Sequence, residues 1–156
     1  MPMNKRQHEF NDRFGRFFEA NGLPRSAGRV LAHLLTTLPA EQTFDDIVAA
    51  LGASRSTISV ATQLLVRIEL VERFGVPNDR RDRYRIRGDA WTMLLRQDVA
   101  AATQLAALAE DGLDVIRSQP ASARKRLEAL RSFARFLEDA YAPILARWEK
   151  LQGDKR

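Results

Sequence analysis

The stretch from Thr43 to Leu70 constrains the fold most, because it predicts two short helices separated by a tight turn. Apolar residues three and four apart indicate an amphipathic helix that ends at Gly52, since glycine tolerates a positive φ best. Ser54 stands where a helix N-cap is needed, and Thr43 occupies the same place before the first helix. The second helix carries an apolar face made of Ile58, Ala61, Leu65 and Ile68. This is the pattern of a helix-turn-helix.

A basic β-hairpin is predicted directly after these helices. Residues 70–74 and 83–87 read as strands, and the loop between them holds Pro77, Asn78 and Asp79. Helix, turn, helix and hairpin in this order predict a winged helix-turn-helix, with the hairpin as its wing. We therefore expect a mainly α fold with a small β-wing.

Positive charge is concentrated in the same part of the chain. The 156 residues carry a net charge of +5, and the segment from Ser54 to Arg87 holds eight arginines against four acidic residues. Little net charge remains for the other residues. A localised basic excess favours a defined face for a polyanion such as double-stranded DNA.

The second helix has a polar face opposite its apolar one, and in helix-turn-helix proteins the start of this helix enters the major groove. We expect Arg55 to donate two hydrogen bonds to guanine, Gln63 to read adenine, and Thr57 to bond backbone or phosphate. A solvated polar face is the alternative, but the adjoining basic hairpin favours nucleic acid. The predicted DNA contacts are Thr43, Arg55, Ser56, Thr57, Ser59, Thr62, Gln63, Arg80, Arg81 and Arg83.

The tip of the hairpin mixes arginines with two carboxylates. Arginines at such a tip can enter a minor groove or contact phosphates. We expect Arg81 and Arg83 to reach the DNA, and the two carboxylates to hold Arg80 or Arg85 in place. Exposed ion pairs of this kind contribute only about 0–1 kcal/mol to stability.

Helices are predicted on both sides of the winged segment. The first two cover residues 5–20 and about 26–36. After residue 89, two long helices with heptad-like apolar seams follow, separated by a break at residues 118–120. Pro143 lies inside the last of them, and we expect it to kink or locally break that helix, because proline removes a helical hydrogen bond.

The long helices must bury their seams against something. They can pack on each other, but Phe133, Phe136 and Leu145 widen the apolar face of the last helix, and the first helix is rich in phenylalanine. We therefore favour a homodimer built from terminal helices over a self-contained monomer. The expected division is residues 1–23 for an N-terminal dimerisation helix, 24–88 for the winged DNA-binding domain, and 89–156 for a two-helix dimerisation region.

Five segments together resemble a known family: Leu51–Ser59, Leu70–Arg73, Asp79–Tyr84, Phe14–Glu19 and Asn21–Arg29. The first three are similar to MarR-type transcriptional regulators, and the last two to the GbsR-like branch of that family. The resemblance implies a homodimer with two winged domains on a palindromic operator. It also implies a regulator, most often a repressor, that a small ligand releases from DNA.

Three positions depart from the pattern of the family. Val48 replaces a small alanine in the first helix of the motif, and Val60 replaces an arginine often found in the second. Asn78 stands where the turn of the wing commonly has glycine, and asparagine tolerates that geometry next best. The departure at Val60 bears directly on how bases are read.

The resemblance also places a small-molecule effector between the winged domain and the dimerisation helices. In this chain the residues that would line such a cavity are Phe17, Phe18, His33, Trp91 and Leu95. The alternative is that all five are ordinary core residues, which aromatic and aliphatic side chains at helical spacing usually are.

Other functions find little support. The chain has no cysteine and only two histidines, and no motif for a nucleophile or a phosphate loop. We therefore expect no enzyme activity, no metal and no cofactor. With no signal peptide or membrane span, we expect a cytoplasmic protein with no membrane partner. The competing interpretations are an architectural DNA binder without sequence preference and a winged helix that binds an acidic protein.

Overall fold

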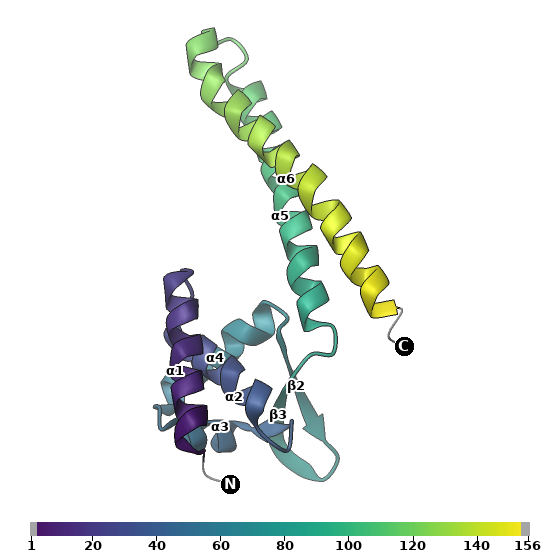
Figure 1. Ribbon diagram of the computed structural model, residues 1–156. Helices are drawn as coiled ribbons and strands as arrows, with labels where there is room; N and C mark the ends of the chain where they lie inside the picture. The colour runs from purple at the N-terminus through teal and green to yellow at the C-terminus, as the bar shows by residue number, and fades with distance from the viewer. Residues whose placement is uncertain (1–2, 154–156) are drawn as a thin grey trace. The chain divides into compact units, whose positions relative to one another are not determined.

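The computed structural model describes residues 3–153, and these residues form a mainly helical fold with one small antiparallel sheet (Figure 1). The chain divides into one compact unit up to Ala90 and a second from Trp91. Among the residues described, no helix is both long and apolar enough to cross a membrane. The predicted fold class is confirmed. The elements are α1 (Lys5–Ala20), α2 (Arg25–Thr36), β1 (Gln42–Thr43), α3 (Phe44–Leu51), α4 (Arg55–Arg67), β2 (Val71–Val76), β3 (Asp79–Ile86), α5 (Ala90–Val115) and α6 (Ala121–Gly153).

Local capping signals set the ends of the two central helices. At the start of α3, the Thr43 hydroxyl accepts from the Asp46 backbone N–H, and the Asp46 carboxylate accepts from the Thr43 N–H. This is a capping box. Gly52 follows α3 in the left-handed conformation with φ 58°, and Ser54 caps α4 by accepting from the Thr57 N–H. The predicted helix-turn-helix boundaries are therefore confirmed.

The sheet has the strand order β1-β3-β2, with antiparallel pairing throughout. The wing strands β2 and β3 are joined by Pro77 and Asn78 alone, and Asn78 has φ 66°, as the second central residue of a type II turn requires. The strands are longer and the loop shorter than predicted. Asp79, Arg80 and Arg81 lie on β3 and not in the loop.

Long aliphatic side chains from α2, α3 and α4 form the core of the first unit, including Leu31, Ile47, Ile58 and Leu65, all at most 1% exposed. The first helix, α1, packs along α2 at close range. A Cβ on Gly28 would lie 2.7 Å from the Phe14 carbonyl oxygen, so this crossing requires glycine. Residues 5–20 therefore pack as part of the first unit, and Phe18 contributes to its core.

The second unit is a helical hairpin in which α5 and α6 lie side by side (Figure 1). Ala102, Ala109 and Ala134 are buried in it, and the Trp148 Nε1 donates to the Thr92 Oγ1 at 2.9 Å. The two seams thus pack on each other. The helix α6 continues without interruption through Pro143, so the predicted local break is wrong. Proline removes a single backbone hydrogen bond, which a helix of 33 residues packed on α5 tolerates.

Candidate nucleic-acid interface

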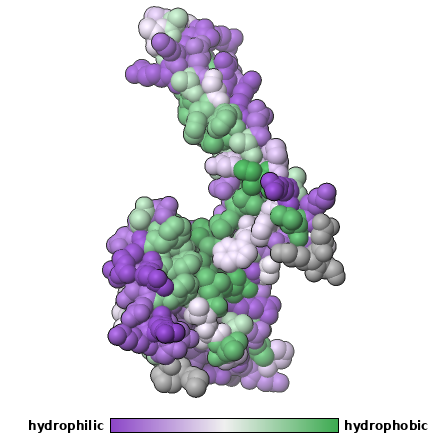
Figure 2. Space-filling view, in the orientation of Figure 1, coloured by the Kyte–Doolittle hydropathy of each residue, from purple (hydrophilic) through white to green (hydrophobic). Residues whose placement is uncertain are grey.

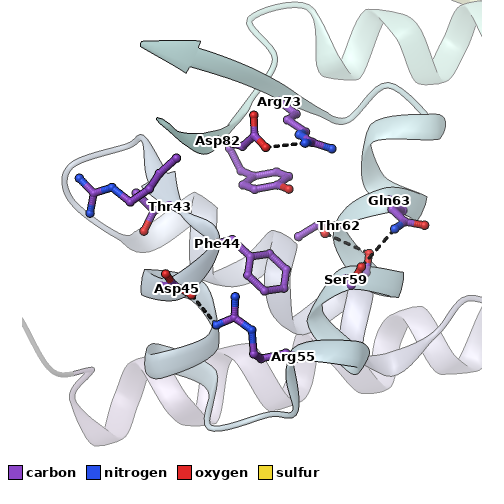
Figure 3. Close-up of a pocket in the computed structure, with 11 residues that line it drawn as sticks. Thr43, Phe44, Asp45, Arg55, Ser59, Thr62, Gln63, Arg73 and Asp82 are labelled. Carbon is purple, nitrogen blue, oxygen red and sulfur yellow. Dashed lines mark hydrogen bonds and ion pairs between the residues drawn. The ribbon is translucent and has the colours of Figure 1, made fainter. Parts of the chain in front are cut away.

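The outward face of α4 combines hydrogen-bonding groups with one apolar side chain. Ser56, Ser59, Val60 and Gln63 follow the helical spacing of three, one and three residues, and each is exposed or half-buried. The Gln63 Nε2 donates to the Ser59 Oγ at 3.1 Å, which fixes the direction of the amide (Figure 3). We call these four residues the α4 stripe. Three of them were predicted as DNA contacts, and Val60 was not.

Thr62 does not lie on this face. It is 1% exposed, and its hydroxyl donates to the Ile58 carbonyl oxygen at 2.9 Å. The prediction that it lies opposite the apolar residues is wrong, because a residue four positions after Ile58 lies on the same face as Ile58. The Thr43 hydroxyl is likewise unavailable, since it is buried and donates to the Asp46 carboxylate at 2.6 Å. Both threonines therefore act in the fold.

Arg55, the first residue of α4, is held on two sides. Its guanidinium lies 2.5 Å from the Asp45 carboxylate and 4.9 Å from the centre of the Phe44 ring (Figure 3). Its side chain is still 67% exposed, so it remains open to a ligand. Nothing in the sequence pattern indicated Phe44 or Asp45. Together they confine the arginine predicted to read guanine.

The exposed start of α4 carries a cluster of hydroxyl groups. The Ser54 Oγ lies 3.0 Å from the Ser56 Oγ and 2.7 Å from the Thr57 Oγ1. The Thr57 hydroxyl thus bonds a neighbouring side chain and not the backbone, and both Ser56 and Thr57 remain exposed. Such hydroxyls, beside the N-terminus of a helix, suit a phosphate group.

On the wing, Asp79 holds the arginines that were expected to reach outward. Its carboxylate lies 2.9 Å from the Arg81 Nε and 3.2 Å from the Arg83 guanidinium. These bonds, Arg81 first, hold the pKa of Asp79 well below its usual range. Side chains alternate along a strand, so residues 79, 81 and 83 of β3 share one face. Asp79 thus pairs with Arg81 and Arg83, whereas the pairing was expected at Arg80 or Arg85. Contact of Arg81 and Arg83 with DNA stays a prediction.

The ion pairs of Arg80 and Arg85 also differ from the expected ones. Arg85 is an ion-pair partner as predicted, but of Glu72 at 2.5 Å and Glu41 at 2.9 Å. Glu72 is its direct cross-strand neighbour. Arg80 is exposed, and its side chain makes no hydrogen bond or ion pair with any of residues 3–153. Of the two arginines named as ion-pair partners, Arg85 therefore has that role and Arg80 does not. Arg80 can reach a ligand without breaking an ion pair.

A hollow of about 200 Å³ between α4 and the sheet brings these groups together (Figure 3). Six predicted DNA contacts belong to its lining: Thr43, Arg55, Ser59, Thr62, Gln63 and Arg81. Sequence reasoning missed Arg73, which forms an ion pair with Asp82 from the neighbouring strand. Arg73 reaches this site because β2 pairs with β3. No local sequence motif indicates that position.

The proposed effector residues fall into different environments. Phe18 and His33 are buried in the first unit, which agrees with the ordinary core reading, and burial lowers the pKa of His33. Phe17 is 61% exposed, so it is not core. Trp91 and Leu95 belong to the second unit. The effector cavity stays a prediction.

In residues 3–153, no group of three His, Asp or Glu side chains is placed to hold a metal ion.

Comparisons with known proteins agree with this geometry. A family described as MmpR5-like MarR family transcriptional regulators matches residues 89–151, and the MarR family matches residues 21–82. The HTH-type transcriptional regulator MmpR5 of Mycobacterium tuberculosis is 32% identical over 146 residues, which cover 94% of this chain and 88% of that protein. A crystal structure of a transcriptional regulator superimposes with a TM-score of 0.83 and 31% identity, covering 93% of this chain and 99% of that one. The MepR–DNA complex of S. aureus gives a TM-score of 0.43 at 18% identity, covering 85% and 91% of the two chains.

Proposed function

Because the chain belongs to the MarR family of transcriptional regulators, we propose that it binds a pseudo-palindromic operator as a homodimer and represses transcription. Each α4 enters a major groove, and each wing contacts the flanking backbone or minor groove. The two half-sites lie about 10 bp apart, one turn of the duplex, because two symmetry-related helices must face the same side of the DNA.

One observation carries the DNA-binding part of this proposal. The α4 stripe presents uncharged groups suited to base edges, while arginines gather beside it on the wing and at Arg55. Protein–DNA interfaces combine groups of both kinds, since arginines contact phosphates or guanine edges and uncharged side chains read other bases through directional hydrogen bonds. We therefore assign DNA contact to Arg55, Ser56, Thr57, Ser59, Gln63, Arg80, Arg81 and Arg83.

The second unit supports the homodimer. It leaves large apolar side chains on its surface, among them Phe133 at 54% and Phe136 at 67% exposed. Figure 2 shows hydrophobic surface on the helix pair. Apolar surface of this kind typically marks a protein interface. We assign residues 89–156 to dimerisation, with a smaller contribution from residues 1–23, and residues 24–88 to DNA.

The finer parts of the proposal rest on resemblance. Release of the operator by a small ligand follows from the family pattern, with Phe17, Phe18, His33, Trp91 and Leu95 as the residues to test. Membership of the GbsR-like branch rests on Phe14–Glu19 and Asn21–Arg29. An activator would use the same DNA interface, so repression is tested separately, by transcription from a promoter that carries the operator.

The test is selection of genomic fragments by the purified protein at about 150 mM salt, followed by sequencing of the bound DNA. We expect an enriched two-fold motif with half-sites one turn apart. If the dimer neutralises about eight phosphates, log K falls against log salt with a slope of roughly −7. A steep slope without enrichment would indicate an architectural binder. Affinity no better than for an unrelated acidic polymer would indicate a protein-binding module.

A further inference from the structure

Val60 is the apolar member of an otherwise polar α4 stripe. Its side chain is 59% exposed, although valine is among the residues most often buried. Ser56 and Gln63 lie one helical turn before and after it on the same face, and Ser59 directly precedes it. The buried face of α4 is on the opposite side of the helix, where Ile58 and Leu65 are at most 1% exposed. Packing within the first unit therefore does not account for a valine at this position.

We propose that Val60 reads the methyl group of a thymine in each half-site, an assignment that rests on the DNA-binding function proposed above. In the major groove of unmodified DNA, thymine is the base that presents a methyl group, at C5. A valine side chain has no hydrogen-bonding group, so it discriminates by apolar contact alone. Its sixth place along α4, near the start that enters the groove, puts it within the part of the helix that reaches base edges.

The neighbour of Val60 one turn along the helix suits the same kind of base pair. Gln63 gives one Nε2–H to Ser59, which leaves its Oε1 and a second N–H to pair with adenine N6 and N7. Residues three apart on a helix have Cβ atoms about 5–6 Å apart, so Val60 and Gln63 address the same or adjacent base pairs. The α4 stripe thus favours an A·T-containing step, with adenine read by Gln63 and a thymine methyl by Val60.

The experiment uses the operator obtained from fragment selection. Each thymine is replaced in turn by deoxyuridine, symmetrically in both half-sites, which removes the methyl and leaves every hydrogen-bonding group in place. We expect one position at which the wild-type Kd rises about fourfold per half-site, the effect of losing one buried methyl-sized group. The Val60→Ala variant should bind the operator with the same Kd whether thymine or uracil stands at that position.

Leu38→Ala is the matched control, because Leu38 is also an exposed apolar residue of the first unit, at 88%, but lies outside α4. This variant should keep the preference for thymine. If no deoxyuridine substitution weakens wild-type binding, or if Val60→Ala retains the preference, the assignment is overturned. Failure of the proposed function would be seen earlier and separately, as no preference for the unmodified operator over random DNA.

Discussion

The two units of this chain bury different kinds of side chain. The first fills its interior with long aliphatic residues, whereas the second buries mainly alanines. This is visible in Leu31, Ile47, Ile58 and Leu65 of the first unit and in Ala102, Ala109 and Ala134 of the second, each at most 2% exposed. Small buried residues allow α5 and α6 to approach closely, but they remove little apolar surface from water.

Several large apolar residues of the second unit are exposed on its surface. Leu108 is 64%, Val115 84% and Phe136 67% exposed. A unit of this composition has surface available for a partner. The first unit has an aliphatic core and fewer exposed large apolar residues, which are Phe17, Leu35, Leu38 and Val60. This difference fits the division of work that we propose, in which the first unit binds DNA and the second forms most of the dimer interface.

The largest effect should follow from opening the core of the first unit. Leu65 is 0% exposed on α4, so Leu65→Ala should lower the free energy of unfolding by about 2–5 kcal/mol through lost burial and a cavity. Leu38→Ala, at an 88% exposed position, should cost under about 1 kcal/mol. Urea unfolding of the full chain measures both. Equal losses would contradict a self-contained core in the first unit.

Association should depend on the second unit. Phe136→Asp puts a charge on the exposed aromatic surface of α6 and should raise the dimer dissociation constant about 30-fold or more, as truncation of a central aromatic does. Leu38→Asp makes the same kind of change on the first unit and should leave the constant unchanged. Sedimentation at several protein concentrations separates the two outcomes. Unaltered association of Phe136→Asp would remove α6 from the proposed dimer interface.

Much of the first unit could be predicted because its signals are local. Thr43, Gly52 and Ser54 are near-neighbour capping signals, and the helix ends they predict are confirmed. The side chains of the site were harder to predict, since they depend on register. Once β3 is known to begin at Asp79, strand alternation explains why that carboxylate holds Arg81 and not Arg80. The sequence pattern indicates a loop for these residues, and alternation does not apply in a loop.

The capping box of α3 should contribute less to the free energy of unfolding than the core does, and its contribution should depend on pH. Asp46→Ala should cost about 1 kcal/mol at neutral pH, because it leaves the backbone N–H and the hydroxyl of Thr43 without their acceptor. Bonds from the Thr43 hydroxyl and N–H lower the pKa of Asp46 from 3.8, so its stabilisation is complete above about pH 4 and is lost as pH falls through the lowered value. The difference between wild type and variant should therefore shrink on acidification.

Asp45→Ala is the control for this measurement, since Asp45 lies in the same first turn but outside the capping box. It should lower stability less than Asp46→Ala and should leave the acid dependence of the wild type in place. An equal loss for both variants would mean that the charge near the helix N-terminus matters, and not the hydrogen bonds of the box.

The smallest effect tests the charged exterior of the first unit. Arg80→Ala should weaken binding to operator and random DNA alike and reduce the salt slope by about 2 for the dimer, because each subunit loses one phosphate contact. Arg126→Ala, an exposed arginine on α6, should leave both affinities and the slope unchanged. Neither variant should alter association. An unchanged slope for Arg80→Ala would mean that Arg80 does not contact a phosphate. A reduced slope for Arg126→Ala would show that the second unit also contacts DNA, which would end the division of work between the units.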